Sequence, residues 1–279
     1  MWEKLLRLDR RWIFVLVALS VLIPLLKPLG LPMKTTEPVL NLYTYIDTLK
    51  PHDKAVILVT DFDPSTMPEL LPMAEAIMRH CFARKIPLIL YGGMYPTFVG
   101  MAKMALSRVL PDFPDVKYGE DYVFLGYIPG TSLIILSMGE SISKTFGNDY
   151  YGNKLDSLPL MQRVKNYDQV ALVIDLSGSG TPVWWIIYGY QRYGVRVGCG
   201  TTAVSAAQYY PYLQTGQFVG MLGGLKGAAE YETLIERAGI PPGRKTASIG
   251  MDAQSIVHLM LIFLIILGNI GYFIVRRKR

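Results

Sequence analysis

The feature that most constrains the fold is the segment of residues 54–64, Lys-Ala-Val-Ile-Leu-Val-Thr-Asp-Phe-Asp-Pro, an apolar run that ends in two carboxylates. A strand that is apolar at every position, and not only at every second one, is typical of burial on both faces within a parallel sheet. Residues 169–175 repeat the pattern and again end in a carboxylate, Asp175. The two segments therefore predict central strands of a parallel sheet.

Helices and further strands alternate with these two segments. Residues 66–84 begin with a capping box, Thr66 to Glu69, and a proline in the first turn, which predicts a helix. Apolar spacing and cap residues predict further helices at 36–49, 95–110, 141–146, 182–193, from 203, and at 225–238. Further strands are predicted at 86–91, 122–127, 132–137 and 195–199, and residues 217–221 are either a weak strand or the start of a helix. The Pro-Gly turn at 129–130 suits a hairpin, so one strand of the pair 122–127 and 132–137 is expected to run antiparallel. This alternation predicts an α/β domain, Rossmann-like or flavodoxin-like, with a mainly parallel sheet and helices on both faces.

Apolar segments lie at both ends of the chain. Residues 12–33 supply the roughly 20 apolar residues that a membrane span needs, with Lys27 reaching the surface. The small residues of a signal-peptide cleavage site are absent, so we expect an uncleaved anchor. Residues 253–275 form a second apolar segment. We therefore expect transmembrane helices at 12–33 and 253–275 on either side of a domain at 34–252.

Basic side chains are concentrated in these ends. Residues 1–33 and 253–279 hold nine Lys and Arg against two acidic residues, whereas residues 34–252 hold 19 basic and 20 acidic residues. The positive-inside rule then predicts that the N-terminus (1–11) and the tail (276–279) are cytoplasmic and that the α/β domain is extracytoplasmic in a cell membrane. A nearly neutral domain also lacks the basic surface of a nucleic-acid-binding protein.

Asn269 is a polar residue deep in the second apolar segment, where an amide favours a hydrogen-bonding partner. At about 1.5 Å per residue, Asn269 and Ser20 lie at similar depths in their helices. One alternative is that the two helices pack with Asn269 near Ser20. The other is that Asn269 contacts a neighbouring subunit.

Polar residues follow several of the predicted strands. In a parallel sheet, ligands bind beyond the carboxyl ends of the strands, at the point where the strand order reverses. The candidates at that edge are Asp61 and Asp63, Ser137 and Glu140, and Asp175, Ser177 and Ser179. Carboxylates that meet at one edge can hold a divalent cation, the one cofactor that the sequence suggests. The turn 178–180 before a helix can bind an anion through backbone N–H groups.

The run 56–65, Val-Ile-Leu-Val-Thr-Asp-Phe-Asp-Pro-Ser, resembles the first motif of the haloacid dehalogenase phosphatases. The resemblance implies a nucleophile at Asp61, a general acid at Asp63 and bound magnesium. It covers about ten residues, and Pro64 stands where that family usually has glycine. An alternative interpretation is that these carboxylates cap the following helix or form an Asx-turn.

Other chemistry finds little support. The glycine fingerprint of dinucleotide-binding proteins and the P-loop are absent from the sequence. Cys81 and Cys199 are too few for a disulfide framework or a thiolate zinc site. His52 and His80 are poorly placed for a catalytic triad, since one precedes the first strand and the other lies late in a helix.

Aromatic residues cluster in two predicted helices and favour protein contacts over a ligand cage. These interface candidates are Trp184, Trp185, Tyr188, Tyr209 and Tyr210. We therefore expect a structural or scaffold subunit of a membrane complex, either a homo-oligomer or an assembly with other subunits. The alternative is a metal-dependent, phosphatase-like hydrolase, or a sensor for a small ligand, that uses the carboxylates at the sheet edge.

Overall fold

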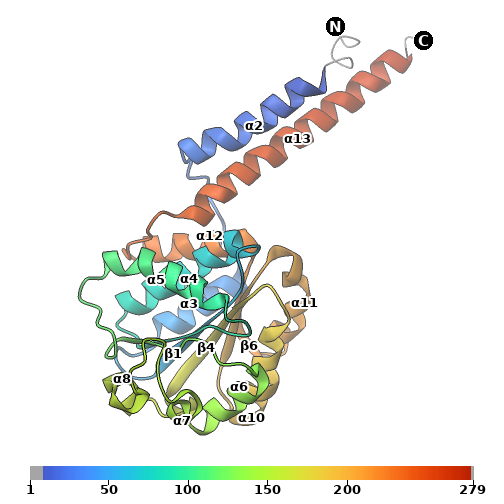
Figure 1. Cartoon of the computed structure of the whole chain (residues 1–279). Helices are drawn as coiled ribbons and strands as arrows, with labels where there is room; N and C mark the ends of the chain where they lie inside the picture. The colour runs from blue at the N-terminus through green and yellow to red at the C-terminus, as the bar shows by residue number, and fades with distance from the viewer. Residues whose placement is uncertain (1–8, 278–279) are drawn as a thin grey trace. The chain divides into compact units, whose positions relative to one another are not determined.

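The computed structural model describes residues 9–277 of the chain. The chain forms two compact units. One unit consists of Met33–Ala247, and the other consists of the two chain ends, up to Pro32 and from Ser248. The larger unit is the α/β domain, and the smaller one contains the two terminal helices (Figure 1).

Six strands form one sheet, and every neighbouring pair is parallel. The strands are β1 (Ala55–Asp61), β2 (Leu88–Tyr91), β3 (Tyr122–Phe124), β4 (Val170–Ser177), β5 (Val197–Thr201) and β6 (Phe218–Gly223). All residues of β1 and β4 are buried, which confirms the prediction from their continuous apolar runs. The spatial order β3-β2-β1-β4-β5-β6 is that of the doubly wound Rossmann class and not that of flavodoxin.

Helices cover both faces of this sheet (Figure 1). On one side lie α3 (Glu37–Asp47), α4 (Met67–Ala83), α5 (Phe98–Val109) and α12 (Gly224–Arg237). On the other lie α6 (Thr131–Glu140), α7 (Ile142–Phe146), α8 (Pro159–Arg163), α10 (Gln191–Tyr193) and α11 (Ala203–Gln214). One continuous helix consists of α9 (Thr181–Trp184), the π-helix η4 (Trp185–Tyr190) and α10 in this order. Short 3₁₀ turns are η1 (Leu110–Asp112), η2 (Leu155–Ser157) and η3 (Tyr167–Gln169).

The predicted strand at 132–137 is wrong, because these residues lie in α6. Ile134, Ile135 and Met138 are buried at helical spacing, whereas Leu133 is exposed. A short apolar run has no periodicity that separates a strand from a helix. The expected antiparallel hairpin is therefore also wrong, and β3 ends at Phe124.

The helix α3 packs directly on two glycines of neighbouring strands. A Cβ atom at Gly220 would lie 2.5 Å from both the Leu42 nitrogen and the Pro38 oxygen, and one at Gly198 would lie 2.7 Å from a Leu42 methyl. Because real Cβ atoms do not come this close to backbone, only glycine at Gly220 permits this contact. Two hydrogen bonds from Thr36 to the buried Glu230 carboxylate, of 2.8 and 2.6 Å, fix the start of α3 against α12.

The smaller unit contains two helices, α2 (Arg10–Leu26) and α13 (Thr246–Arg277), which lie side by side (Figure 1). Within the described residues, one helix is long and apolar enough to cross a membrane, Thr246–Arg276. The N-terminal helix does not extend to residue 33 as expected, since it ends at Leu26 after 17 residues. At about 1.5 Å per residue its length is roughly 25 Å, and Lys27-Pro28 stops it.

Polar contacts in this unit differ from those we expected. The Ser20 hydroxyl donates to the Leu16 carbonyl at 2.8 Å and lies 3.1 Å from the Met260 sulfur. The Asn269 amide donates to the Ile265 carbonyl of its own helix at 2.9 Å. The structure thus places Ser20 against Met260 instead of Asn269. The Asp252 carboxylate accepts hydrogen bonds from three consecutive backbone N–H groups, those of residues 29–31.

Candidate functional site

The strand order reverses between β1 and β4. From β1 the chain continues outward through β2 and β3, and from β4 it continues in the opposite direction through β5 and β6. The loops that follow β1 and β4 therefore diverge at the carboxyl edge, which is the usual ligand site of such sheets. The polar residues of interest lie at this switch point.

Strand register places these residues in two rows on one face of the sheet. Directly paired residues of parallel strands point to the same side, as do residues two apart within one strand. In the row at the carboxyl ends of the strands, Ser177 lies between Asp61 and Thr201. In the row two residues before it, Val59 lies between Tyr91 and Asp175, and Asp175 pairs with Cys199. We call Asp61, Tyr91, Asp175 and Thr201 the switch-point cluster.

The cluster has buried polar atoms without protein partners. These atoms are one oxygen of Asp61, both carboxylate oxygens of Asp175, the Tyr91 hydroxyl and the Thr201 hydroxyl. Asp61 is 2% exposed and the other three residues are fully buried. Each unpaired buried polar group costs about 1–3 kcal/mol of stability. The four residues with such atoms lie on four neighbouring strands of the sheet, β2, β1, β4 and β5.

The environment disfavours the ionised forms of both acids. Burial raises the pKa of Asp61, and the Thr181 hydroxyl and the Met94 N–H, 2.7 Å from Oδ1, oppose the increase. Burial and the nearby Asp61 raise the pKa of Asp175 well above its usual range, and the Thr181 hydroxyl opposes the increase. Burial and the same two carboxylates raise the pKa of Tyr91. The two acids therefore hold a proton more tightly than exposed carboxyls do.

The loop after β4 lies above the cluster. The Ser177 hydroxyl accepts hydrogen bonds from the Ser179 N–H at 2.9 Å and from the Thr181 hydroxyl at 2.8 Å. The Tyr209 hydroxyl donates to the Ser179 carbonyl at 2.7 Å. These hydrogen bonds hold the loop in place, and residues 178–180 are exposed to solvent. The helix that follows contains the π-helix η4, a distortion that is frequent at functional sites.

The structure brings Asp61, Asp175 and Ser177 together as neighbours at this edge and places the others differently. Asp63 is half-buried in the next loop, where its carboxylate accepts the Ser65 N–H at 2.8 Å and the Ser65 hydroxyl at 2.5 Å. This is an Asx-turn. Hydrogen bonds from Ser65 lower the pKa of Asp63. Ser179 lies on the exposed loop, and its hydroxyl contacts Ser177 at 3.0 Å.

Two of the proposed candidates depended on the strand that is absent. Ser137 and Glu140 lie in α6, and the Glu140 carboxylate accepts a hydrogen bond from Tyr193 at 3.0 Å. Sequence reasoning missed Tyr91, Thr201 and Thr181. The signal for the first two was their position at the ends of β2 and β5, since carboxyl ends of parallel strands share one edge.

Among the residues that the structure describes, no group of three or more His, Cys, Asp or Glu side chains is placed to hold a metal ion. Cys81 and Cys199 are both buried, free thiols.

The aromatic interface candidates divide into buried and accessible residues. Trp185 and Tyr209 are each 1% exposed and belong to the core against the sheet. Trp184 and Tyr210 are exposed, and Tyr188 is half-buried. Only the latter three are therefore accessible to a partner in the described domain.

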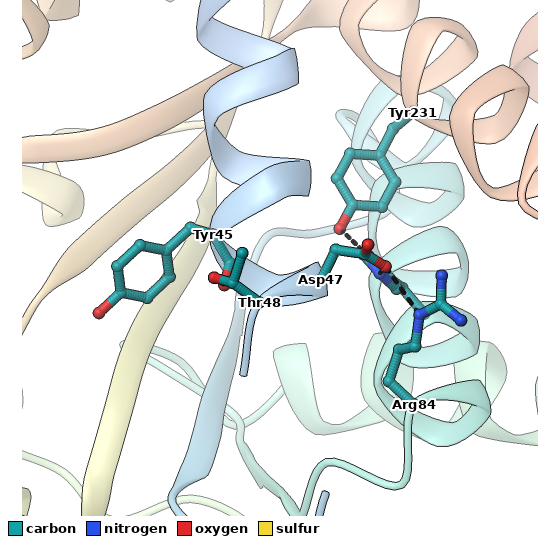
Figure 2. A network of polar contacts seen from close by, with 6 residues as sticks. Tyr45, Asp47, Thr48, Arg84 and Tyr231 are labelled. Carbon is teal, nitrogen blue, oxygen red and sulfur yellow. Dashed lines mark hydrogen bonds and ion pairs between the residues drawn. The ribbon is translucent and has the colours of Figure 1, made fainter. Parts of the chain in front are cut away.

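A second polar network lies on the opposite side of the domain, among α3, α4 and α12. The His80 ring contacts the Tyr231 hydroxyl at 2.7 Å through Nδ1 and the Asp47 carboxylate at 3.2 Å through Nε2. Figure 2 shows Asp47 between Arg84 and Tyr231, and the Arg84 Nε donates to Asp47 at 2.7 Å. His80 and Tyr231 are fully buried. The network joins three helices, with His80 and Tyr231 in the interior and Asp47 and Arg84 at the surface.

The chain was compared with protein-family models, curated proteins and solved structures. No protein-family model, no curated protein and no solved structure matches the chain. The likeness of residues 56–65 to a phosphatase motif is therefore not accompanied by a match along the rest of the chain. The fold and the site define the chain as a doubly wound α/β protein with an apolar terminal helix.

Proposed function

We propose that this chain is a membrane-anchored binding protein whose α/β domain holds a small ligand at the carboxyl ends of β1 and β4. The observation that carries the proposal is the switch-point cluster, whose buried polar atoms lack protein partners at the usual ligand position of this sheet. A ligand that supplies those hydrogen bonds offsets the cost of burying them.

Binding fits the cluster better than phosphatase chemistry. A nucleophilic carboxylate has to be ionised, whereas burial raises the pKa of Asp61 and so disfavours its ionised form. A general acid at Asp63 would have to hold a proton, but its pKa is lowered by the Ser65 hydrogen bonds. Neither side chain meets the requirement of its role in that mechanism.

The test places a bulky side chain in the loop after β4, next to the proposed ligand site. A Cβ atom at Gly180 would meet no atom within 4 Å, so Gly180→Trp adds a bulky side chain to the exposed loop without an internal clash. Ser107→Trp is the matched control, because it adds the same side chain to an exposed position on α5. Full-length protein is extracted gently and denatured, and the released ions and compounds are identified by elemental analysis and mass spectrometry. We expect one species in stoichiometric amount from the wild type and the control and its loss from Gly180→Trp. Equal amounts from all three, or none from the wild type, would refute the proposal.

We further propose two membrane helices, with both termini in the cytoplasm and the α/β domain outside it. The support is the apolar helix α13, the apolar surface of α2 and the basic residues that flank both. The exposed large apolar side chains of α2 include Trp12, Phe14 and Leu26. A helix shorter than the hydrocarbon thickness is accommodated by local thinning of the bilayer.

The second candidate function is that of a scaffold subunit in a membrane complex, as a homo-oligomer or with other subunits. The observation that favours it is exposed apolar area on neighbouring helices, where Leu133 is 67%, Ile187 43% and Trp184 37% exposed. The native mass of the same gentle extract tests it. A particle several times the 31.3 kDa of the chain supports assembly, and a monomer without other chains refutes it.

A further inference from the structure

A cavity of about 410 Å³ lies at the amino ends of β1, β2 and β3, the edge of the sheet opposite the switch point. Its lining comes from residues 52, 82–83, 85–86, 112–117 and 120–121, which precede these strands along the chain. The volume lies within the range of about 300–1,000 Å³ that is usual for small-molecule sites. Because doubly wound sheets bind their usual ligands at the carboxyl edge, this cavity is distinct from the site proposed above.

The buried part of the cavity wall is apolar. Phe82 is 5% and Ile86 1% exposed. Phe113 is half-buried, and its ring meets that of Phe82 edge to face with the centroids 5.9 Å apart. This part of the wall can hold the apolar body of a ligand, because contact removes apolar surface of both from water.

Six charged side chains also line the cavity, and two of them lack a partner. Four bind to groups of the protein itself: Asp112, Lys117, Glu120 and Asp121. The side chains of the other two, Lys85 and Asp115, make no ion pair or hydrogen bond within residues 9–277, and both residues are exposed. The cavity therefore offers one positive and one negative charge to a ligand.

The backbone at Lys85 supports a role for its side chain. Lys85 follows the C-cap of α4 with a φ of 55°, and the Ile86 N–H closes the turn on the Cys81 carbonyl at 2.9 Å. Helices commonly end on glycine in this left-handed conformation, because a side chain disfavours it. His52 has the same φ of 55° and donates its N–H to the Lys85 carbonyl at 2.8 Å. Two of the three non-glycine residues with positive φ in the described part of the chain thus line this cavity, and such conformations gather at ligand sites.

We propose that this cavity binds a small zwitterion with an apolar body, either a free amino acid with a large apolar side chain or a short peptide of such residues. The carboxylate of the ligand pairs with Lys85, its ammonium group pairs with Asp115, and its apolar body packs on Phe82 and Phe113. A compound with a single charge would satisfy only one of the two unpartnered side chains, so charge complementarity selects a zwitterion.

The test measures binding of L-leucine, L-phenylalanine and L-leucyl-L-phenylalanine to the full-length protein in detergent by isothermal titration calorimetry. We expect saturable binding of one molecule per chain for at least one of them. Binding of a free amino acid identifies that source, and binding confined to the dipeptide identifies short peptides. No binding of any of the three overturns the inference.

Derivatives of the compound that binds test the charge and the apolar body separately. N-acetylation removes its positive charge and amidation of the carboxyl group removes its negative charge. Each should weaken binding several-fold, since an exposed ion pair contributes modestly. Glycine, which has the same charges without an apolar body, should not bind. Derivatives that bind as tightly as the zwitterion would show that the charges are not recognised.

Lys85→Gly separates binding from folding, because its two expected effects have opposite signs. Glycine suits the backbone at this position, so the midpoint of thermal unfolding without ligand should rise. Loss of the ammonium group should at the same time weaken binding several-fold, as should Asp115→Asn. Lys245→Gly is the matched control, because it also replaces a lysine with positive φ but lies outside the cavity, and its binding should equal that of the wild type. Wild-type binding by Lys85→Gly would contradict the assignment.

Gly180→Trp distinguishes this cavity from the site at the carboxyl ends of β1 and β4. Its loop follows β4 at the opposite edge of the sheet, so the variant should bind the amino acid or dipeptide as the wild type does. Loss of this binding in Gly180→Trp would assign the compound to the carboxyl edge and make the inference wrong while the proposed binding function stands.

Discussion

At the scale of single residues, burial affects the pKa of His80 more than the neighbouring charge of Asp47 does. His80 touches the ionised Asp47, whose attraction favours the charged ring, yet burial dominates and lowers the pKa of His80 to about 4. Asp47 can only accept a hydrogen bond, so Nε2 carries the ring proton and Nδ1 accepts from the Tyr231 hydroxyl. His80 is therefore neutral and bridges two helices.

The sign of the pH dependence follows from this lowered value. An exposed histidine in the unfolded chain has a pKa of about 6.5, so the unfolded state takes up the proton first as the pH falls. We expect the free energy of unfolding to fall by up to about 3 kcal/mol between pH 6.5 and pH 4 through His80, given its folded value of about 4. Chemical denaturation of the wild type and of His80→Gln across that range measures it, with a flatter profile expected for the variant. His52→Gln, which changes an exposed histidine, should keep the wild-type profile. Parallel profiles for wild type and His80→Gln would contradict the assignment.

At the scale of elements, helix positions depend on glycines that let backbones approach. The sequence pattern predicted a helix at 36–49, and the structure has α3 at Glu37–Asp47. The pattern did not indicate its partners, β5 and the edge strand β6. That contact depends on Gly198 in β5 and Gly220 in β6, which lie more than 150 residues beyond α3 along the chain.

Gly220→Ala should therefore destabilise the domain by about 1–3 kcal/mol, the usual cost of overpacking. The added methyl would meet the backbone of α3 at 2.5 Å, and backbone cannot rotate aside as a side chain can. Gly100→Ala is the matched control. Gly100 lies in α5 with no atom within 4 Å of an added Cβ, so alanine should raise stability by up to about 1 kcal/mol. Urea unfolding of both variants measures the pair, and equal effects would contradict the close contact.

Part of the candidate site was predictable from the sequence, because some of its residues end strands that are easy to recognise. Asp61, Asp175 and Ser177 were identified because they end two strands that the apolar runs made evident. Tyr91 and Thr201 were missed because strand register, and not composition, decides that they face the same side. Ser137 and Glu140 were placed wrongly because α6 was taken for a strand.

At the scale of the whole molecule, the proposed topology places the α/β domain outside the cytoplasm, and chemical labelling of a cysteine can test it. Both native thiols are buried, and burial raises the pKa of Cys81 to about 12, so neither should react with a thiol reagent while the protein is folded. A cysteine introduced at an exposed position then reports its own compartment.

We expect Ser107→Cys to react with a membrane-impermeant maleimide on intact cells that express the full chain. Ser107 is exposed on α5, and the proposed topology places that helix outside the cytoplasm. Gel-shift labelling before and after permeabilisation measures this, with the unsubstituted protein as the unlabelled control. Labelling only after permeabilisation would reverse the orientation.

The sequence by itself determined the class of fold and the apolar ends, because both follow from local patterns. Continuous apolar runs mark buried parallel strands, and the terminal runs mark an apolar helix at 246–276. The tertiary structure alone decided the strand order, the row of Tyr91, Asp175 and Cys199, and the closeness of Gly220 to α3. These depend on which distant segments lie side by side, and in a single sequence no local preference encodes that pairing.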